Sequence, residues 1–196
     1  MGIMAKISNR ERILQEGLRV VHEQGFGGAS VRDIVMAAGV PQGSFTNHFV
    51  SKEAFGLEIL DIYFANSREV INRTLRNDAV DPLDRLRAYV DAQIAHIKES
   101  DMRNGCLFGN FSAEATDKSE PIRLRLVEIF AEVQKSIEYC LKAAAKAGEI
   151  PPKSKVSDLA EFIVSCLQGS ILLAKTRRSA LPVEHFKAFL FSTILR

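Results

Sequence analysis

The chain has 196 residues, 46% of them hydrophobic and 26% charged, which suffices for a small N-terminal domain and one larger domain with a real core. Its net charge of +2 lies wholly in residues 1–52, with six Lys and Arg against four Asp and Glu, and this distribution gives no support for a polybasic tail. Three cysteines without paired spacing exclude a zinc motif and, with no secretory signal, favour reduced thiols in the cytoplasm. The apolar uncharged stretch at residues 162–174 is too short to span a bilayer, so we expect no membrane partner.

Residues 30–53 predict two short helices joined by a turn, followed by the start of a third helix. Ser30 begins the first helix, and Asp33 stands at the spacing of a capping box. The apolar face of this helix consists of Val31, Ile34, Val35 and Ala38. Gly39 supplies the turn, because glycine enters the left-handed conformation without steric cost.

The second short helix is expected to expose a polar face. Val40, Phe45 and Phe49 are spaced to bury its other side, and the polar face carries no acidic residue: Gln42, Ser44, Thr46, Asn47 and His48. Because the DNA major groove admits such a helix, we interpret the segment as a helix-turn-helix. Lys52, beside the N–H groups that Ser51 starts to cap, is a candidate phosphate anchor. The alternative is a helical hairpin whose polar face merely meets water.

From about Asn9 to Phe55 the chain resembles the TetR family of bacterial transcriptional regulators. The resemblance rests on the segments ILQEGLRVVHEQGF, SVRDIVMAAGV, GSFTNHF and SKE. It implies phosphate contacts by Arg32, Ser44, His48 and Lys52, and an approach to the bases by Gln42, Thr46 and Asn47. Thr46 departs from the family pattern, which usually has a tyrosine there that packs on the DNA backbone. We therefore expect a three-helix helix-turn-helix DNA-binding domain in residues 1–50.

Residues 51–196 are expected to form a helical effector-binding and dimerisation domain, which makes the whole chain all-α. Hydrophobic periodicity predicts helices over residues 51–75, 82–99, 106–115, 120–147, 156–175 and 183–195. Pro82 can begin the second of these, and Gly148 with the following Pro151-Pro152 pair ends the long one. The first of these helices runs directly from the DNA-binding head into the body and links the two mechanically.

The last two expected helices are rich in apolar residues, and the first of them is apolar nearly all round, so it must be buried on two sides. One side can face the chain's own core, and we infer that a second copy covers the other in a four-helix homodimer interface. Gly169 and Ser170 let helices approach closely. The resemblance implies the same dimer, which reads a palindrome with half-sites roughly 34–36 Å, or a multiple, apart.

The resemblance also implies a small-molecule effector pocket in the body, whose filling alters the spacing of the two heads. Gln93 falls within the apolar stripe of the 82–99 helix, where it either has an internal partner or meets a ligand. The candidate lining residues are Tyr63, Tyr89, His96, Phe108, Phe111 and Phe130. An ordinary aromatic core is the alternative for this set.

Cys106 is a candidate sensor thiol. It lies at the start of an expected helix, three residues after Arg103, so we expect the pKa of its thiol to be lowered. The segment NGCLFGNFSAE resembles the electrophile- and quinone-responsive TetR regulators, including the N-ethylmaleimide-responsive ones, in which a cysteine at this place takes part in sensing. A structural or pocket-lining cysteine is the alternative. Cys140 and Cys166 lie on apolar faces and are expected to be inert.

Together these features predict a cytoplasmic homodimeric repressor that an effector releases from a palindromic DNA operator. An activator on the same scaffold and a helical dimer without specific DNA binding are the alternatives. The sequence contains no nucleophile elbow, paired-carboxylate site or metal triad, and its four histidines are scattered. We therefore expect no catalysis, metal or cofactor.

Overall fold

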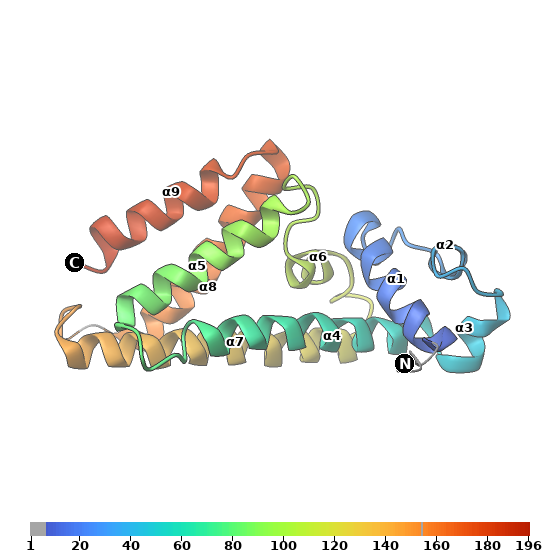
Figure 1. Ribbon diagram of the computed structural model, residues 1–196, viewed down its shortest axis with the longest axis horizontal. Helices are drawn as coiled ribbons and strands as arrows, with labels where there is room; N and C mark the ends of the chain where they lie inside the picture. Colours follow the sequence, from blue (N-terminus) through green and yellow to red (C-terminus); the bar gives the residue numbers. More distant parts are fainter. Residues whose placement is uncertain (1–6, 154) are drawn as a thin grey trace, which may run out of the picture. The chain divides into compact units, whose positions relative to one another are not determined.

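A computed structural model describes residues 7–153 and 155–196, and this part of the chain contains helices and turns but no strand (Figure 1). The expected all-α fold is confirmed. The elements are α1 (Asn9–Gln24), α2 (Val31–Ala37), α3 (Gly43–His48), α4 (Lys52–Arg73), α5 (Pro82–Lys98), α6 (Leu107–Glu114), α7 (Glu120–Ala147), α8 (Val156–Arg177), α9 (Leu181–Phe189) and the π-helical turn η1 (Leu190–Ile194). The last predicted helix therefore begins two residues earlier than expected and ends in a π-helical turn.

Packing divides the described chain into two compact units. Unit 1 comprises the described residues up to 63 together with residues 110–125, and unit 2 comprises residues 64–109 and 126–196. Three helices, α4, α6 and α7, contribute residues to both units. The predicted domain boundary between residues 50 and 51 separates a DNA-binding domain from an effector-binding and dimerisation domain. This division is one of function, which the packing does not test, so it stays a prediction.

In unit 1, α1, α2 and α3 lie close together (Figure 1). The predicted capping box of α2 is confirmed: the Asp33 N–H donates to Ser30 Oγ at 3.1 Å, and the Ser30 N–H donates to the Asp33 carboxylate at 3.0 Å. Gly39 has a φ of 61°, as its place in the turn requires. Arg12 of α1 donates to the Gly39 carbonyl at 3.2 Å, so α1 holds this turn in place.

An aromatic cluster fixes α3 to the start of α4. Phe45 and Phe49 are both 3% exposed, which confirms that they bury one side of α3. Their ring centroids lie 5.4 and 5.3 Å from that of Phe55, which is fully buried in α4. Gly17 of α1 is needed beside this cluster, because an added Cβ would lie 2.4 Å from the Phe55 ring. Helix α3 has only six residues, which is too short for a helix to be stable in isolation, so it depends on this packing for its helical conformation.

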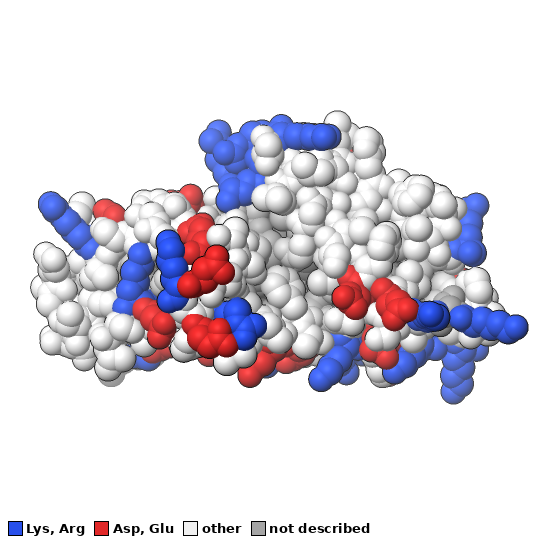
Figure 2. All heavy atoms as spheres, turned by 180° about the vertical axis from the view of Figure 1, so that it is seen from behind, with Lys and Arg blue, Asp and Glu red and all other residues white. Residues whose placement is uncertain are grey.

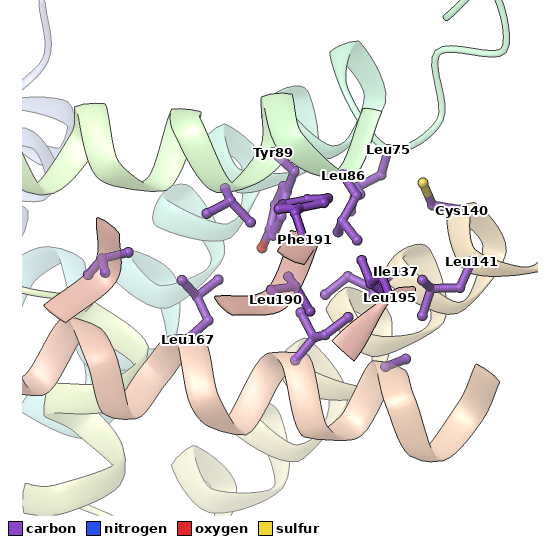
Figure 3. Packing of buried hydrophobic residues seen from close by; sticks show 14 of the residues in the cluster. Leu75, Leu86, Tyr89, Ile137, Cys140, Leu141, Leu167, Leu190, Phe191 and Leu195 are labelled. Carbon is purple, nitrogen blue, oxygen red and sulfur yellow. The ribbon is translucent and has the colours of Figure 1, made fainter. Parts of the chain in front are cut away.

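The core of unit 2 gathers side chains from α5, α7, α8 and the C-terminal turn (Figure 3). Leu86 and Tyr89 of α5 point toward Phe191 of η1, and Leu167 of α8 completes the layer. Cys140 is buried in the same core, and its thiol donates to the Pro82 carbonyl at 3.0 Å. Burial raises the pKa of Cys140 to about 11, in line with the expectation that it is inert.

Helices α8 and α9 leave an apolar face uncovered. Its large members are between 43% and 63% exposed: Phe162, Leu172, Leu173, Leu181 and Phe189. Gly169 lies among them, with open space where a Cβ would be. Figure 2 shows a broad uncharged surface here, with Lys and Arg gathered at the C-terminal end of α8.

The uncharged stretch 162–174 lies inside α8, which is longer than the stretch itself. Helix α8 is by length and composition apolar enough to cross a membrane, and 22% of its most apolar window is buried. The prediction concerned only the uncharged stretch, whereas the helix that contains it has 22 residues and meets these two criteria as a whole. A single such helix is weak support for a membrane, since a helix that packs against a partner passes the same test.

Candidate nucleic-acid interface and effector region

The outer face of α3 presents four of its five predicted polar residues. Gln42, Thr46, Asn47 and His48 are exposed. Ser44 is 8% exposed, so the prediction that it faces outward is wrong. The reason is that α3 packs against both α1 and α2, which makes its buried face wider than the apolar stripe of the sequence. Arg32, in the first turn of α2, is exposed as a phosphate contact requires.

Lys52 begins α4, and its ammonium is bound inside unit 1. Its Nζ donates to the carbonyl oxygen of Phe26 at 2.5 Å and lies 4.8 Å from the centroid of the Phe26 ring. Burial lowers the pKa of Lys52, against the opposing attraction of Glu114 and Asp33. Ser51 Oγ accepts from the Ala54 N–H at 3.0 Å, which confirms that Ser51 caps this helix. The contact between Lys52 and a phosphate stays a prediction. Without DNA, the Lys52 ammonium is bound to the Phe26 carbonyl oxygen instead.

Cys106 precedes α6 and is half-buried in unit 2. The backbone N–H groups of Gly109 and Phe108 and the side chain of Gln168 hydrogen-bond to its sulfur and lower the pKa of the thiol. Burial raises this pKa by more, so the net shift is upward and the predicted lowering is wrong. Tyr89 of α5 is close enough to interact electrostatically with Cys106, and burial strongly raises its phenol pKa.

The predicted aromatic lining is divided between the two units. In unit 2, Phe108 meets Phe64 and Phe130 edge-on, with centroids 6.1 and 6.2 Å away. In unit 1, the Phe111 ring packs 4.7 Å from that of Phe26, and the Tyr63 ring lies 5.5 Å from that of His22. These contacts are those of a packed aromatic core.

The two remaining polar candidates lie on α5. Gln93 is half-buried, and His96 pairs with Glu99 at 3.3 Å. A groove of about 580 Å³ between α5 and the C-terminal elements and a cavity of about 230 Å³ in unit 1 have other linings. Neither brings together the eight predicted effector residues, so their role stays a prediction.

Among residues 7–153 and 155–196, no three His, Cys, Asp or Glu side chains are grouped as a metal ion would need.

Comparison with known proteins decides the family. Residues 13–59 match the family model of bacterial regulatory proteins of the tetR family, and residues 82–190 match the tetracyclin repressor-like C-terminal domain. The chain belongs to the TetR family. It is similar to the transcriptional repressor DhaR of Mycobacterium sp. (strain GP1), with 36% identity over 192 residues, which cover 98% of this chain and 95% of the relative.

Solved TetR structures share the fold. A TetR regulatory protein from Rhodobacter sphaeroides superimposes with a TM-score of 0.88 and 26% identity, over 93% of this chain and 97% of that one. The reduced form of E. coli NemR superimposes with a TM-score of 0.84 and 27% identity, over 93% and 94%. NemR is itself named a transcriptional repressor.

As a TetR-family protein, the chain is a DNA-binding transcriptional regulator and not an enzyme. TetR-family regulators bind operator DNA, function as dimers and respond to ligand effectors. A helical dimer without specific DNA binding is not favoured.

Three residues that contact the predicted sites were missed in the sequence. Gln168 was visible only as a polar interruption of an apolar helix, yet it hydrogen-bonds to Cys106. Phe26 and Glu114, which surround the Lys52 ammonium, carry no local signal, because they come from segments 88 residues apart.

Proposed function

We propose that this TetR-family regulator is a cytoplasmic repressor that binds a palindromic operator as a homodimer and is released by a small-molecule or electrophilic effector. The observation that carries the DNA-binding part is the exposed polar face of α3, free of acidic residues and fixed on the Phe45–Phe49–Phe55 cluster. The names of DhaR and NemR support repression rather than activation. A dimer on a promoter blocks the polymerase, and an effector acts by favouring a conformer whose heads no longer fit the half-sites.

For the DNA contacts we propose two sets. Gln42, Thr46 and Asn47 approach the bases, because all three are exposed, Gln42 at the N-cap of α3 and the other two within this helix. Arg32, in the first turn of α2, and His48, the last residue of α3, are both exposed and contact phosphates. Ser44 is left out of the second set because its side chain is buried.

For the dimer we propose an interface of α8 and α9 from each subunit. The apolar residues exposed on these two helices support it, because an uncovered patch of this kind is typical of a protein–protein interface. Gly169 has no neighbour where a Cβ would be, so the helix of a second copy can approach closely there.

For the effector we propose a site in unit 2 beside Cys106, Tyr89 and Gln168. These side chains place a thiol, a phenol and an amide together in an otherwise apolar core. That grouping fits either a bound organic molecule or an electrophile that alkylates Cys106. A Cys106→Ser protein that keeps its response to the inducer would remove the second possibility.

The deciding experiment is in vitro selection of duplexes from a random DNA pool with the purified protein, followed by affinity measurements on the recovered duplex. We expect a palindrome. Gln42→Ala should cost roughly 1–3 kcal/mol at particular base positions and relax the preference there. Gln15→Ala, an exposed glutamine on α1, is the matched control and should change nothing. Binding that is salt-sensitive but indifferent to sequence would overturn the proposal.

A further inference from the structure

One peptide group of unit 1, the one that joins Phe26 to Gly27, is held on both sides by charged side chains. Its carbonyl oxygen accepts from Lys52 Nζ at 2.5 Å, and its N–H donates to Glu114 Oε2 at 2.8 Å. In a trans peptide the C=O and the N–H point in opposite directions, so the cation and the carboxylate hold opposite edges of one plane. Lys52 is the first residue of α4 and Glu114 is the last residue of α6.

The loop around this peptide is shaped to receive the carboxylate. Gly25 has a φ of 81°, and a Cβ there would lie 2.5–3.0 Å from the Glu114 carboxylate atoms. A Cβ on Gly28 would lie 2.6 Å from the backbone oxygen of Gln24. The Phe26 ring, which also faces the Lys52 ammonium, packs on Phe111 of α6. Glycines therefore serve here both for backbone conformation and for a close approach.

This contact ties together the two ends of the helix-turn-helix. The clamped peptide begins at Phe26, four residues before Ser30, which caps α2, and Lys52 follows the end of α3 at His48 by four residues. Helices α2 and α3 lie between these two points. We propose that Lys52 and Glu114 are positioning residues that fix α3 in register for operator binding by clamping the Phe26–Gly27 peptide. The inference rests on the DNA-binding function and assigns to Lys52 an intramolecular partner in place of a phosphate.

The direction in which one substitution changes operator affinity distinguishes a positioning role of Glu114 from a purely electrostatic one. If Glu114 acted on DNA only through its charge, Glu114→Gln would remove a repulsive acid and strengthen binding. If Glu114 positions the head, the same change weakens operator binding, because the hydrogen bond that it makes as a carboxylate is about twice as strong as a neutral one. Asp117→Asn is the matched control, since it removes the same charge from an exposed side chain three residues along the chain.

The salt dependence of operator binding tests the role of Lys52. A lysine that neutralises a phosphate contributes about 0.9 to the slope of log K against log salt concentration. Lys52→Met keeps most of the aliphatic stem and removes the ammonium. We expect it to weaken operator binding while leaving that slope unchanged. In a double-mutant cycle, Lys52→Met and Glu114→Gln should be less than additive, because both act through one peptide.

The experiment uses the full-length protein and the duplex recovered by selection, with an unrelated duplex of equal length beside it. We expect Glu114→Gln to bind the selected duplex about tenfold more weakly and the unrelated duplex equally well, with Asp117→Asn unchanged on both. Hydrogen exchange at the Gly27 amide, followed by NMR, should accelerate in Glu114→Gln alone.

Selected-duplex binding by Glu114→Gln that equals or exceeds that of the parent would overturn the inference. A salt slope lowered by about one unit in Lys52→Met would overturn the assignment of Lys52 and restore it as a phosphate contact. If the parent itself recovers no palindrome, the proposed function fails, and unchanged Gly27 exchange in Glu114→Gln then separately refutes the clamp.

Discussion

Replacing Phe49 by alanine is expected to loosen α3 more than any change on its exposed face. The side chain is 3% exposed, and its ring lies 5.1 Å from that of Phe45 and 5.3 Å from that of Phe55. Removing a buried Phe costs about 3–5 kcal/mol, to which each lost ring pair contributes roughly 0.5–1.5 kcal/mol. Since whole domains are stable by only about 5–15 kcal/mol, this loss is a large fraction of the stability that keeps α3 in place.

The assay is native-state hydrogen exchange of peptides from α2 and α3, combined with operator affinity by fluorescence anisotropy. Phe49→Leu is the control, because it keeps most of the volume and should cost about 1 kcal/mol. We expect Phe49→Ala to raise exchange throughout α3 and to lower operator affinity. Equal exchange in the two variants, or operator affinity in Phe49→Ala equal to that of the parent, would refute the argument that the aromatic cluster sustains this helix.

Three further outcomes are expected. Gly39→Ala should lower the free energy of unfolding by about 1–2 kcal/mol in a urea titration, because of the positive φ; an unchanged midpoint would contradict this. Leu172→Glu should yield monomers in sedimentation experiments, whereas Val127→Glu, also on an exposed apolar position, should stay dimeric; dimeric Leu172→Glu would argue against the α8–α9 interface. Alkylation of Cys106 by N-ethylmaleimide, followed by mass spectrometry, should accelerate about tenfold between pH 8 and pH 9, because a pKa above the ordinary value of about 8.5 keeps most of the thiol protonated over that interval; a rate that levels off there would contradict the raised pKa.

Local features of the fold were predictable because their causes are local. The capping box of Ser30 and Asp33, the left-handed Gly39 and the ends of most helices depend on neighbouring residues only. The same holds for the burial of Phe45 and Phe49, whose spacing defines one face of a helix.

What the sequence did not reveal depends on contacts between distant segments. The burial of Ser44 follows from two helices that cover α3, and the partner of the Lys52 ammonium comes from a loop 26 residues away. Cys106 shows a balance of two effects. The start of α6 lowers its pKa as expected, but burial, which no local pattern discloses, outweighs that contribution.

The division between buried and exposed residues in α3 also bears on how operator preference can change. Phe45 and Phe49 hold the helix, whereas Gln42, Thr46 and Asn47 are exposed and take no part in that cluster. Surface substitutions away from packed sites usually change stability by within about 0.5 kcal/mol, while a lost base contact costs roughly 1–3 kcal/mol of binding. Substitutions at the three exposed positions can therefore alter the preferred sequence without unfolding the head. A Thr46→Tyr variant, which restores the usual family residue, tests this argument, since it should change DNA affinity while leaving the thermal unfolding midpoint in place. A large fall in that midpoint would show that base recognition by this helix cannot be changed independently of its stability.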